Sequence, residues 1–309
     1  MCGIAGIIHR DGPSDMGVEI TKMLQSMKHR GPDSTGYALY SEPDDLVTIR
    51  FMLAEPKEYG GFGIDERLER GRAEVESRLA KIGADLATIH SDTGYAFRAT
   101  VRYDGDLKPL ADYLEDIPGC KVLSLGNSLE IIKDLGDAIT VQEQYSLAGI
   151  RGTHGIGHVR MATESDVDLA SAHPYWAYPF ADVAVVHNGQ LTNYHKMKRL
   201  YEQDGYRFQT HHDSELIAVY LAHHLERDAD LKRTLHRALE DLDGTFTFLV
   251  STPTGLGCAK DKWSAKPLVI MERHDVVAVA SEEVALRQVF PEEIERFEPQ
   301  ENEVITWST

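Results

Sequence analysis

The sequence has few cysteines, a deficit of basic residues and no long apolar run. Its 309 residues include three cysteines, Cys2, Cys120 and Cys258, which are far apart and form no Cys-x-x-Cys pair. Isolated cysteines in odd number argue against a disulfide framework and a thiolate metal site. No apolar segment approaches the roughly 20 residues of a membrane span, and the N-terminus lacks the regions of a signal peptide. These absences predict a cytoplasmic protein with reduced thiols.

Basic residues are outnumbered by acidic ones, 32 to 50, which gives a net charge of −18. Such a charge argues against binding to nucleic acid or to an anionic membrane, because both require basic surfaces. The histidine pairs 211–212 and 223–224 suggest a metal site, but no ligand triad accompanies them and we predict no metal. The sequence also contains no P-loop. At 42% hydrophobic residues, the chain is an ordinary globular protein.

Apolar periodicity predicts two regions of mixed structure. Residues 4–8 form a buried strand, and apolar side chains at helical spacing predict a helix over 18–27. Further strands are predicted over 37–40, 155–160, 183–187, 245–251, 267–271 and 276–280, and helices over 191–204, 213–227 and 230–242. Strands with helices between and around them indicate an α+β sandwich and not a Rossmann-type parallel sheet.

Residues 46–150 are predicted to be a separate inserted module of unknown role. The polar, turn-forming stretch 41–45 precedes it. Its strands are predicted over 48–54, 86–89, 95–103 and 121–125, and its helices over 65–84 and 107–117. This βαββαβ order is typical of a ferredoxin-like fold. The main domain then comprises residues 2–45 and 151–309.

A cysteine in position two has a special chemical option. Removal of Met1 would leave Cys2 with a thiol and a free α-amino group on one residue. Such an amine has a pKa of about 7.7–8.0, so that it can act as the local base for its own thiol. Taken alone, Cys2 is equally compatible with an incidental cysteine.

Three further sites suit amide hydrolysis at such a thiol. Asn188 and Gly189 follow an apolar strand and could donate two hydrogen bonds to one oxyanion, although a strand-ending turn has the same sequence. Arg160 offers a planar fork for a carboxylate, although many such arginines form surface ion pairs. Asp213 opens a predicted helix, either as its N-cap or as the partner of an ammonium group.

Together these motifs, in this order, resemble the class II glutamine amidotransferases, N-terminal-nucleophile hydrolases whose glutaminase domain supplies ammonia to a synthase. The resemblance rests on Cys2-Gly3-Ile4-Ala5-Gly6, on residues 29–36 (HRGPDSTG), 158–163 (HVRMAT), 172–174 (AHP), 187–189 (HNG) and 213–215 (DSE), and on 266–268 with 280–282. It spans about residues 2–41 and 151–309. The fold that it implies is a four-layer αββα sandwich, here with the ferredoxin-like insert.

The resemblance also implies a role for each position. Cys2 would attack the side-chain amide of glutamine, and Asn188 with Gly189 would form the oxyanion hole. The substrate-binding residues would be Arg160 and Thr163 at the α-carboxylate, Asp213 at the α-ammonium, and Arg30 and His173 along the pocket.

The chain departs from the family in three respects. Relatives usually have a short connection in place of the insert, and Met161 and Glu164 stand where they often carry an aromatic residue and a histidine. No sugar-isomerase or phosphoribosyl motif is present. We therefore expect a glutaminase subunit that supplies ammonia to a separate synthase of the glutamate-synthase or N-methylglutamate-synthase type. FMN or iron–sulfur centres would lie on those partners, with no cofactor in this chain.

Two alternatives stay open at the level of sequence. The chain could be an independent N-terminal-cysteine amidase that acts on γ-glutamyl compounds, since an α-amino acid head group is common to both substrates. It could also be a non-catalytic regulatory subunit whose insert senses a small molecule.

Overall fold

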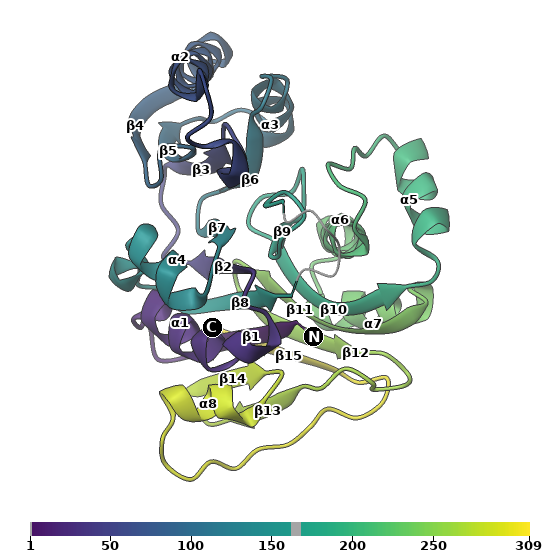
Figure 1. Cartoon of the computed structure of the whole chain (residues 1–309). Coiled ribbons are helices and arrows are strands. Elements are labelled where there is room, and N and C mark those ends of the chain that lie inside the picture. The colour runs from purple at the N-terminus through teal and green to yellow at the C-terminus, as the bar shows by residue number, and fades with distance from the viewer. Residues whose placement is uncertain (1, 162–167) are drawn as a thin grey trace.

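Two antiparallel sheets lie face to face, and a third, smaller sheet extends from one end of them (Figure 1). The computed structural model describes residues 2–161 and 168–309. The larger sheet contains, in spatial order, β13 (Val269–Glu272), β14 (Val276–Ala280), β1 (Gly3–His9), β8 (His154–Arg160), β2 (Ser34–Tyr40) and β7 (Leu129–Leu135). The second contains β15 (Val304–Ser308), β12 (Gly255–Lys260), β11 (Gly244–Thr252), β10 (Ala184–Leu191) and β9 (Tyr175–Trp176).

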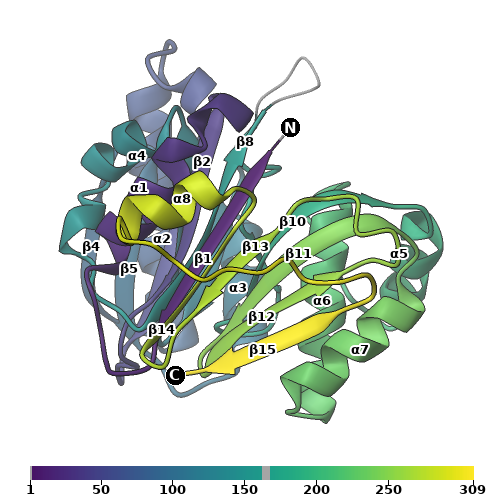
Figure 2. The same cartoon turned by 90° about the horizontal axis from the view of Figure 1, so that it is seen from below.

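Helices cover the outer faces of both sheets (Figure 2). On the six-stranded sheet these are α1 (Met16–Ser26), α4 (Ala138–Gln144) and α8 (Glu283–Val289). On the five-stranded sheet they are α6 (Asp213–Arg227) and α7 (Leu231–Asp241), with α5 (Tyr194–Gln203) beside α6. Short 3₁₀ turns lie at η1 (Lys28–Arg30), η2 (Pro56–Glu58) and η3 (Leu147–Gly149). The four-layer αββα sandwich predicted from the sequence is confirmed.

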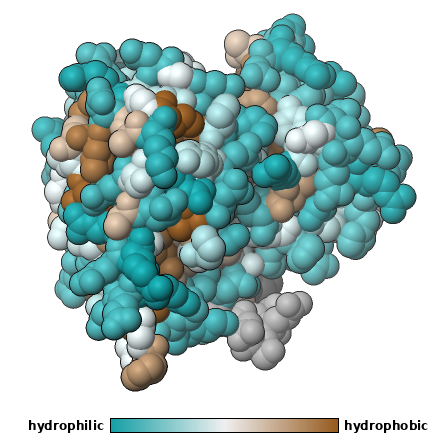
Figure 3. All heavy atoms as spheres, turned by 90° about the horizontal axis from the view of Figure 1, so that it is seen from above, coloured by the Kyte–Doolittle hydropathy of each residue, from teal (hydrophilic) through white to brown (hydrophobic). Residues whose placement is uncertain are grey.

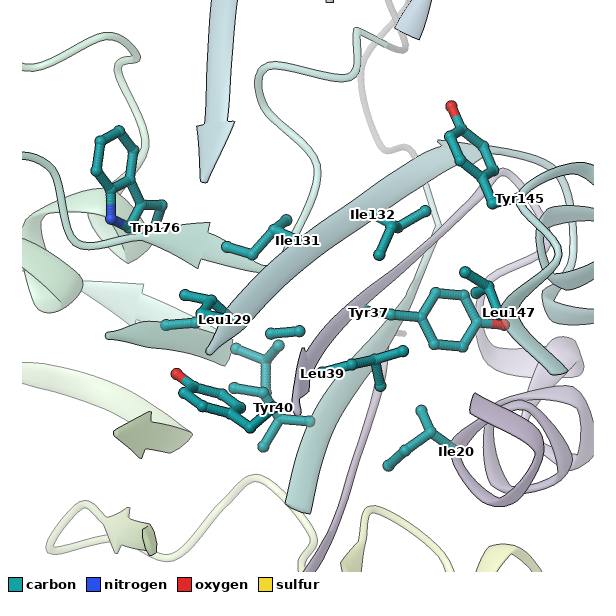
Figure 4. Packing of buried hydrophobic residues seen from close by; sticks show 14 of the residues in the cluster. Ile20, Tyr37, Leu39, Tyr40, Leu129, Ile131, Ile132, Tyr145, Leu147 and Trp176 are labelled. Atoms are coloured by element: carbon teal, nitrogen blue, oxygen red, sulfur yellow. The ribbon is translucent and has the colours of Figure 1, made fainter. Parts of the chain in front are cut away.

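Strands of the six-stranded sheet are apolar on both faces because both faces are covered. In β7, Leu129 and Ile131 point to the same side as Trp176, whereas Ile132 points to the opposite side with Tyr37 (Figure 4). This alternation is the period of two that any strand imposes on its side chains. The two sheets are also joined by polar contacts, since the Tyr40 hydroxyl donates to the carbonyl of Ser251 at 2.9 Å.

The insert is a four-stranded antiparallel sheet of spatial order β4-β5-β3-β6 with two helices. Its elements are β3 (Val47–Met52), α2 (Ile64–Ile82), β4 (Asp85–Ser91), β5 (Ala96–Arg102), α3 (Leu107–Glu115) and β6 (Lys121–Gly126). Both the βαββαβ order and this strand order are those of a ferredoxin-like fold. The helices begin and end close to the positions that apolar periodicity predicts.

The C-terminal end of the insert differs from the sequence boundary at residue 150. The strand β7 pairs with β2 along its whole length, with Tyr37 opposite Ile132, and α4 packs against α1. Residues 129–150 thus add to the sandwich and not to the small sheet. We propose that the insert ends near Asn127.

The sequence pattern does not predict several of the observed elements, among them β7, α4, β12, β15 and α8.

An ion-pair cluster joins the insert to the sandwich. Glu130 of β7 binds Arg50 of β3 at 2.7 Å and Arg98 of β5 at 2.8 Å. Arg50 also binds Asp92 at 2.6 Å. Burial raises the pKa of Glu130, but the two guanidinium groups outweigh it and the net shift is downward. Because the arginines are themselves partnered, the cluster keeps its charges balanced away from water.

The face shown in Figure 3 is mostly hydrophilic, with apolar side chains in small groups. Among the described helices, none combines the length and the apolar character needed to cross a membrane.

Asp182 fixes the turn between β6 and β7. Its buried carboxylate accepts hydrogen bonds from the backbone N–H groups of Asn127 (3.1 Å), Ser128 (3.1 Å) and Leu129 (2.8 Å). A Cβ on Gly126 would lie 2.0 Å from this carboxylate, which explains the glycine there. One side chain therefore binds the chain as it leaves the insert.

We expect Asp182→Ala to lower the free energy of unfolding by roughly 3 kcal/mol, because three backbone donors lose a charged acceptor. Asp182→Asn keeps one oxygen acceptor and is expected to cost less. Urea denaturation of the three proteins measures this order. A loss below about 1 kcal/mol for the alanine variant would show that water replaces the carboxylate.

Candidate active site

Cys2 lies at the start of a strand inside the six-stranded sheet. The strand β1 pairs with β8 on one side and with β14 on the other. Its Ile4 exchanges two hydrogen bonds with Ser281, whose hydroxyl accepts from the Ile4 N–H at 3.0 Å and whose N–H donates to the Ile4 carbonyl at 2.9 Å. Pairing on both sides holds an N-terminal residue that would otherwise be mobile.

The carbonyl oxygen of Cys2 accepts two side-chain hydrogen bonds. Arg30 donates through Nε at 3.0 Å, and Asn188 donates through Nδ2 at 3.2 Å. Arg30 is itself paired with Glu282, with 2.5 Å between Nη1 and Oε1. Arg30 therefore reaches the pocket mainly as an anchor for Cys2, with its charge balanced by Glu282.

A cavity of about 860 Å³ opens beside Cys2. It is lined by polar residues from both sheets and from the start of α6, so that segments far apart in sequence meet there. The residues from the sequence prediction that line it are Cys2, Arg30, Arg160, His173, Asn188, Gly189 and Asp213. Thr163 and Glu164 lie outside the described residues.

Asn188 and Gly189 lie inside β10, opposite Thr247 and Phe246 of β11. The alternative of a strand-ending Asn-Gly turn is therefore wrong, because β10 continues to Leu191. Gly189 has a φ of +135°, and a Cβ on it would lie 2.0 Å from the carbonyl oxygen of Thr245. Only glycine fits this position, so its N–H can face the cavity without a side chain in the way.

Two glycines of the segment 29–36 allow the backbones of other site residues to pack closely against that segment. A Cβ on Gly31 would lie 2.4 Å from the backbone carbon of Arg160. A Cβ on Gly36 would lie 2.0 Å from the carbonyl oxygen of His173. The motif thus contains glycine where the backbones that carry Arg160 and His173 pack against it.

Asp213 is the first residue of α6, and His212 occupies the N-cap. The N-cap role considered from the sequence is therefore wrong. Instead, Oδ2 of Asp213 accepts a hydrogen bond from the backbone N–H of Leu191 at 2.8 Å. The carboxylate is thereby fixed at the cavity wall, where the helix N-terminus favours a negative charge.

Three buried histidines form a cluster beside Ser214, the residue after Asp213. The Ser214 hydroxyl lies 2.8 Å from His173 Nε2 and 2.9 Å from His187 Nδ1, and His158 stacks on His173. Burial lowers the pKa of all three imidazoles, that of His158 to about 3, and it outweighs the attraction of Asp213 for a proton on His187. They are neutral at pH 7 and place no positive charge beside Asp213.

Comparison with known proteins identifies the family. A family model described as a glutamine amidotransferase domain matches residues 158–288. A protein of Methanothermobacter thermautotrophicus, provisionally named a glutamine amidotransferase, is 39% identical over 97% of this chain and 98% of its own length. The chain belongs to the class II glutamine amidotransferases. The glutamine amidotransferase-like protein GlxB of Rhizobium meliloti is 33% identical to this amidotransferase, over 99% of the chain and 98% of its own length.

Solved structures share the fold of this amidotransferase. The glutamine phosphoribosylpyrophosphate amidotransferase of B. subtilis superposes with a TM-score of 0.59 at 21% identity. A second structure, described as the allosteric regulatory enzyme of purine biosynthesis, gives a TM-score of 0.62 at 21% identity. Each match covers 99% of this chain and 47% of the other. These likenesses concern the sandwich fold.

Several residues of the site have no role in the sequence prediction. Four of them belong to the motifs behind the resemblance, but only their contacts show where they lie in the site: Ser214, Ser281, Glu282 and Lys266.

The two histidines that the sequence suggested as metal ligands, His211 and His212, line the cavity. Among the described residues, no group of three or more His, Cys, Asp or Glu side chains is arranged to hold a metal ion.

Acid should destabilise the amidotransferase through its buried histidines. The unfolded chain takes up a proton on His158 near pH 6.5, whereas the folded chain does so only at about pH 3. The free energy of unfolding should fall as the pH drops below about 6.5, by up to about 1.4 kcal/mol per pH unit for each such histidine. Urea titrations between about pH 7 and 5 should give a shallower slope for His158→Gln. Parallel slopes would contradict a neutral buried His158.

Proposed function

We propose that this amidotransferase hydrolyses the side-chain amide of glutamine through a thioester on Cys2 and supplies the ammonia to a separate synthase subunit. The observation that carries the proposal is the convergence of Cys2, Asn188, Gly189, Arg160 and Asp213 on one cavity. These residues come from both sheets and from α6, and together they offer a nucleophile, oxyanion donors and two opposite charges.

The reaction begins when the Cys2 sulfur attacks the amide carbon of the glutamine side chain. The developing oxyanion receives hydrogen bonds from the Asn188 side chain and the Gly189 N–H, while the α-amine of Cys2 accepts the thiol proton and passes it to the leaving nitrogen. The carbon–nitrogen bond breaks, ammonia leaves and a thioester remains. Water then cleaves the carbon–sulfur bond, which releases glutamate and restores the thiol.

Selectivity for glutamine comes from its two α-substituents. Arg160, the last residue of β8, is only half-buried and offers its guanidinium to the α-carboxylate. Asp213 offers its carboxylate to the α-ammonium, while its Oδ2 also accepts the Leu191 N–H and its Oδ1 lies 3.6 Å from Nδ1 of the neutral His187. Opposite charges on two walls bind a zwitterion in one orientation.

The mechanism requires that Met1 be removed, because an N-terminal Met would convert the proposed amine base into an amide. Cys2 is small enough for that cleavage.

The two relatives that match nearly end to end, both named for glutamine amidotransferases, support the assignment of glutamine as substrate. We further propose a glutamate-synthase-like or N-methylglutamate-synthase partner as the ammonia acceptor, with FMN or iron–sulfur centres on that partner; the sequence resemblance supports this part.

Cys2→Ala should lower kcat/KM for glutamine hydrolysis by about a thousandfold or more, because the nucleophile is lost. The assay needs protein whose intact mass shows that Met1 is absent, tested alone and with a candidate synthase, which should raise the rate. Cys120→Ala is the matched control, since burial raises the pKa of that thiol to about 12 and this residue of the insert does not line the cavity. Processed protein that never hydrolyses glutamine, with or without partners, would refute the proposal.

Asp213→Asn should remove the preference for a substrate with an α-ammonium group. We expect the wild type to favour glutamine over glutaramate, its analogue without the amino group, by roughly 10- to 100-fold in kcat/KM. The variant should lose most of that ratio while its activity on glutaramate changes little. Asp243→Asn, at an exposed carboxylate outside the cavity, is the control. An unchanged ratio in Asp213→Asn would assign the ammonium to another group.

A further inference from the structure

The insert contacts two segments of the sandwich that lead directly into the cavity. One is residues 168–173, which end at His173, and the other is residues 207–213, which end at Asp213. In Figure 1 both segments lie on the side of the sandwich that faces the insert. We propose that the insert acts as a clamp that sets the affinity for glutamine, with Glu55 as a positioning residue; this rests on the proposed function.

Glu55 follows β3 of the insert and reaches the first segment. Its Oε2 accepts a hydrogen bond from the backbone N–H of Leu169 at 2.9 Å. On the cavity side, Arg160 donates to the carbonyl of Asp168 at 3.4 Å. Glu55 and the proposed carboxylate ligand therefore bind adjacent residues of one segment, so that a shift of this segment would move Arg160.

Lys133 holds the other end of the same segment. Its buried ammonium donates to the carbonyl of Ala172 at 2.7 Å and to that of Ala170 at 3.4 Å, and it lies 5.3 Å from the centre of the Tyr175 ring. Burial lowers the pKa of Lys133 to about 8, and the nearby carboxylate of Glu55 opposes that shift. Glu55 and Lys133 thus bind backbone N–H and C=O groups, respectively, within the segment that ends at His173.

The second segment is held in a similar way. Glu115, the last residue of α3, accepts a hydrogen bond from the Gln209 side chain at 2.6 Å. The backbone N–H groups of Gln209 and Thr210 donate to Glu215 of α6 at 2.7 and 2.8 Å. Asp112 of the insert adds contacts with Tyr178 and Arg207. The turn that precedes Asp213 is therefore bound from the insert and from its own helix.

None of the three insert carboxylates, Glu55, Asp112 and Glu115, lines the cavity. They cannot touch glutamine and act only through the segments they hold. Loosening a segment leaves Cys2 and Asn188 in place, because those residues are fixed by β1 and β10. The expected consequence is weaker substrate binding with little change in the chemical step.

The test compares Glu55→Ala with Glu55→Gln, which keeps an oxygen for the Leu169 N–H, and with Glu76→Ala, an exposed helix position of the insert paired with Arg72. Hydrogen exchange of peptides covering 168–175 should be several-fold faster in Glu55→Ala alone. The KM for glutamine should rise roughly five- to tenfold in that variant, with kcat within about twofold of wild type. Glu55→Gln should restore most of the wild-type KM.

Unchanged exchange in folded Glu55→Ala, or faster exchange with an unchanged KM, would overturn the proposal. If Glu55→Ala does not fold, as judged by circular dichroism, Gln209→Ala replaces it, and peptides covering 207–212 are followed in the same way. A wild type without glutaminase activity would refute the proposed function and, with it, the effect on affinity. The exchange data would still decide separately whether the insert holds the two segments.

Discussion

The site depends on the pairing of β1 between two neighbours of the six-stranded sheet. A chain terminus normally frays, but here the N-terminal strand has hydrogen-bonded partners on both edges and apolar cover on both faces. The Cys2 carbonyl then accepts hydrogen bonds from Arg30 of η1 and Asn188 of β10. The thiol therefore has a defined position relative to the proposed oxyanion donors, which an unpaired terminus would not provide.

The charge of the cavity depends on which charged side chains form ion pairs and which histidines are neutral. Arg30 is balanced by Glu282, and burial keeps the three histidines beside Ser214 uncharged. Among the described residues that line the cavity, Arg160, Lys266 and Asp213 are the other charged side chains that a zwitterionic substrate would meet. The Ser214 hydroxyl lies within hydrogen-bond distance of one ring nitrogen of His173 and one of His187, and it can donate one hydrogen bond and accept others without a further charge.

The insert shares a continuous apolar core with the sandwich, and charged groups add directional contacts between the two. The Glu130 cluster, Asp182 and Glu55 each bind backbone or arginine groups across the joint. Such contacts depend on direction, so they fix orientation more closely than apolar packing does. The module attached in this way contacts two segments that lead to the cavity.

The sequence by itself determined the class of the fold and the order of elements in the insert, because apolar periodicity is a local property of the chain. The family resemblance of its motifs pointed to seven residues that the structure brings together at the cavity. The sequence could not determine β7 and α4. The strand β7 has the sequence LEIIKDL, in which Glu130 and Lys133 are charged residues typical of an exposed position. They are accommodated inside the protein only because Arg50 pairs with Glu130 and the carbonyl of Ala172 accepts a hydrogen bond from Lys133. Nor could the sequence place Asn188 inside β10 or balance Arg30 with Glu282, partners separated by 252 residues. Those features depend on contacts between distant segments, and only the tertiary structure decided them.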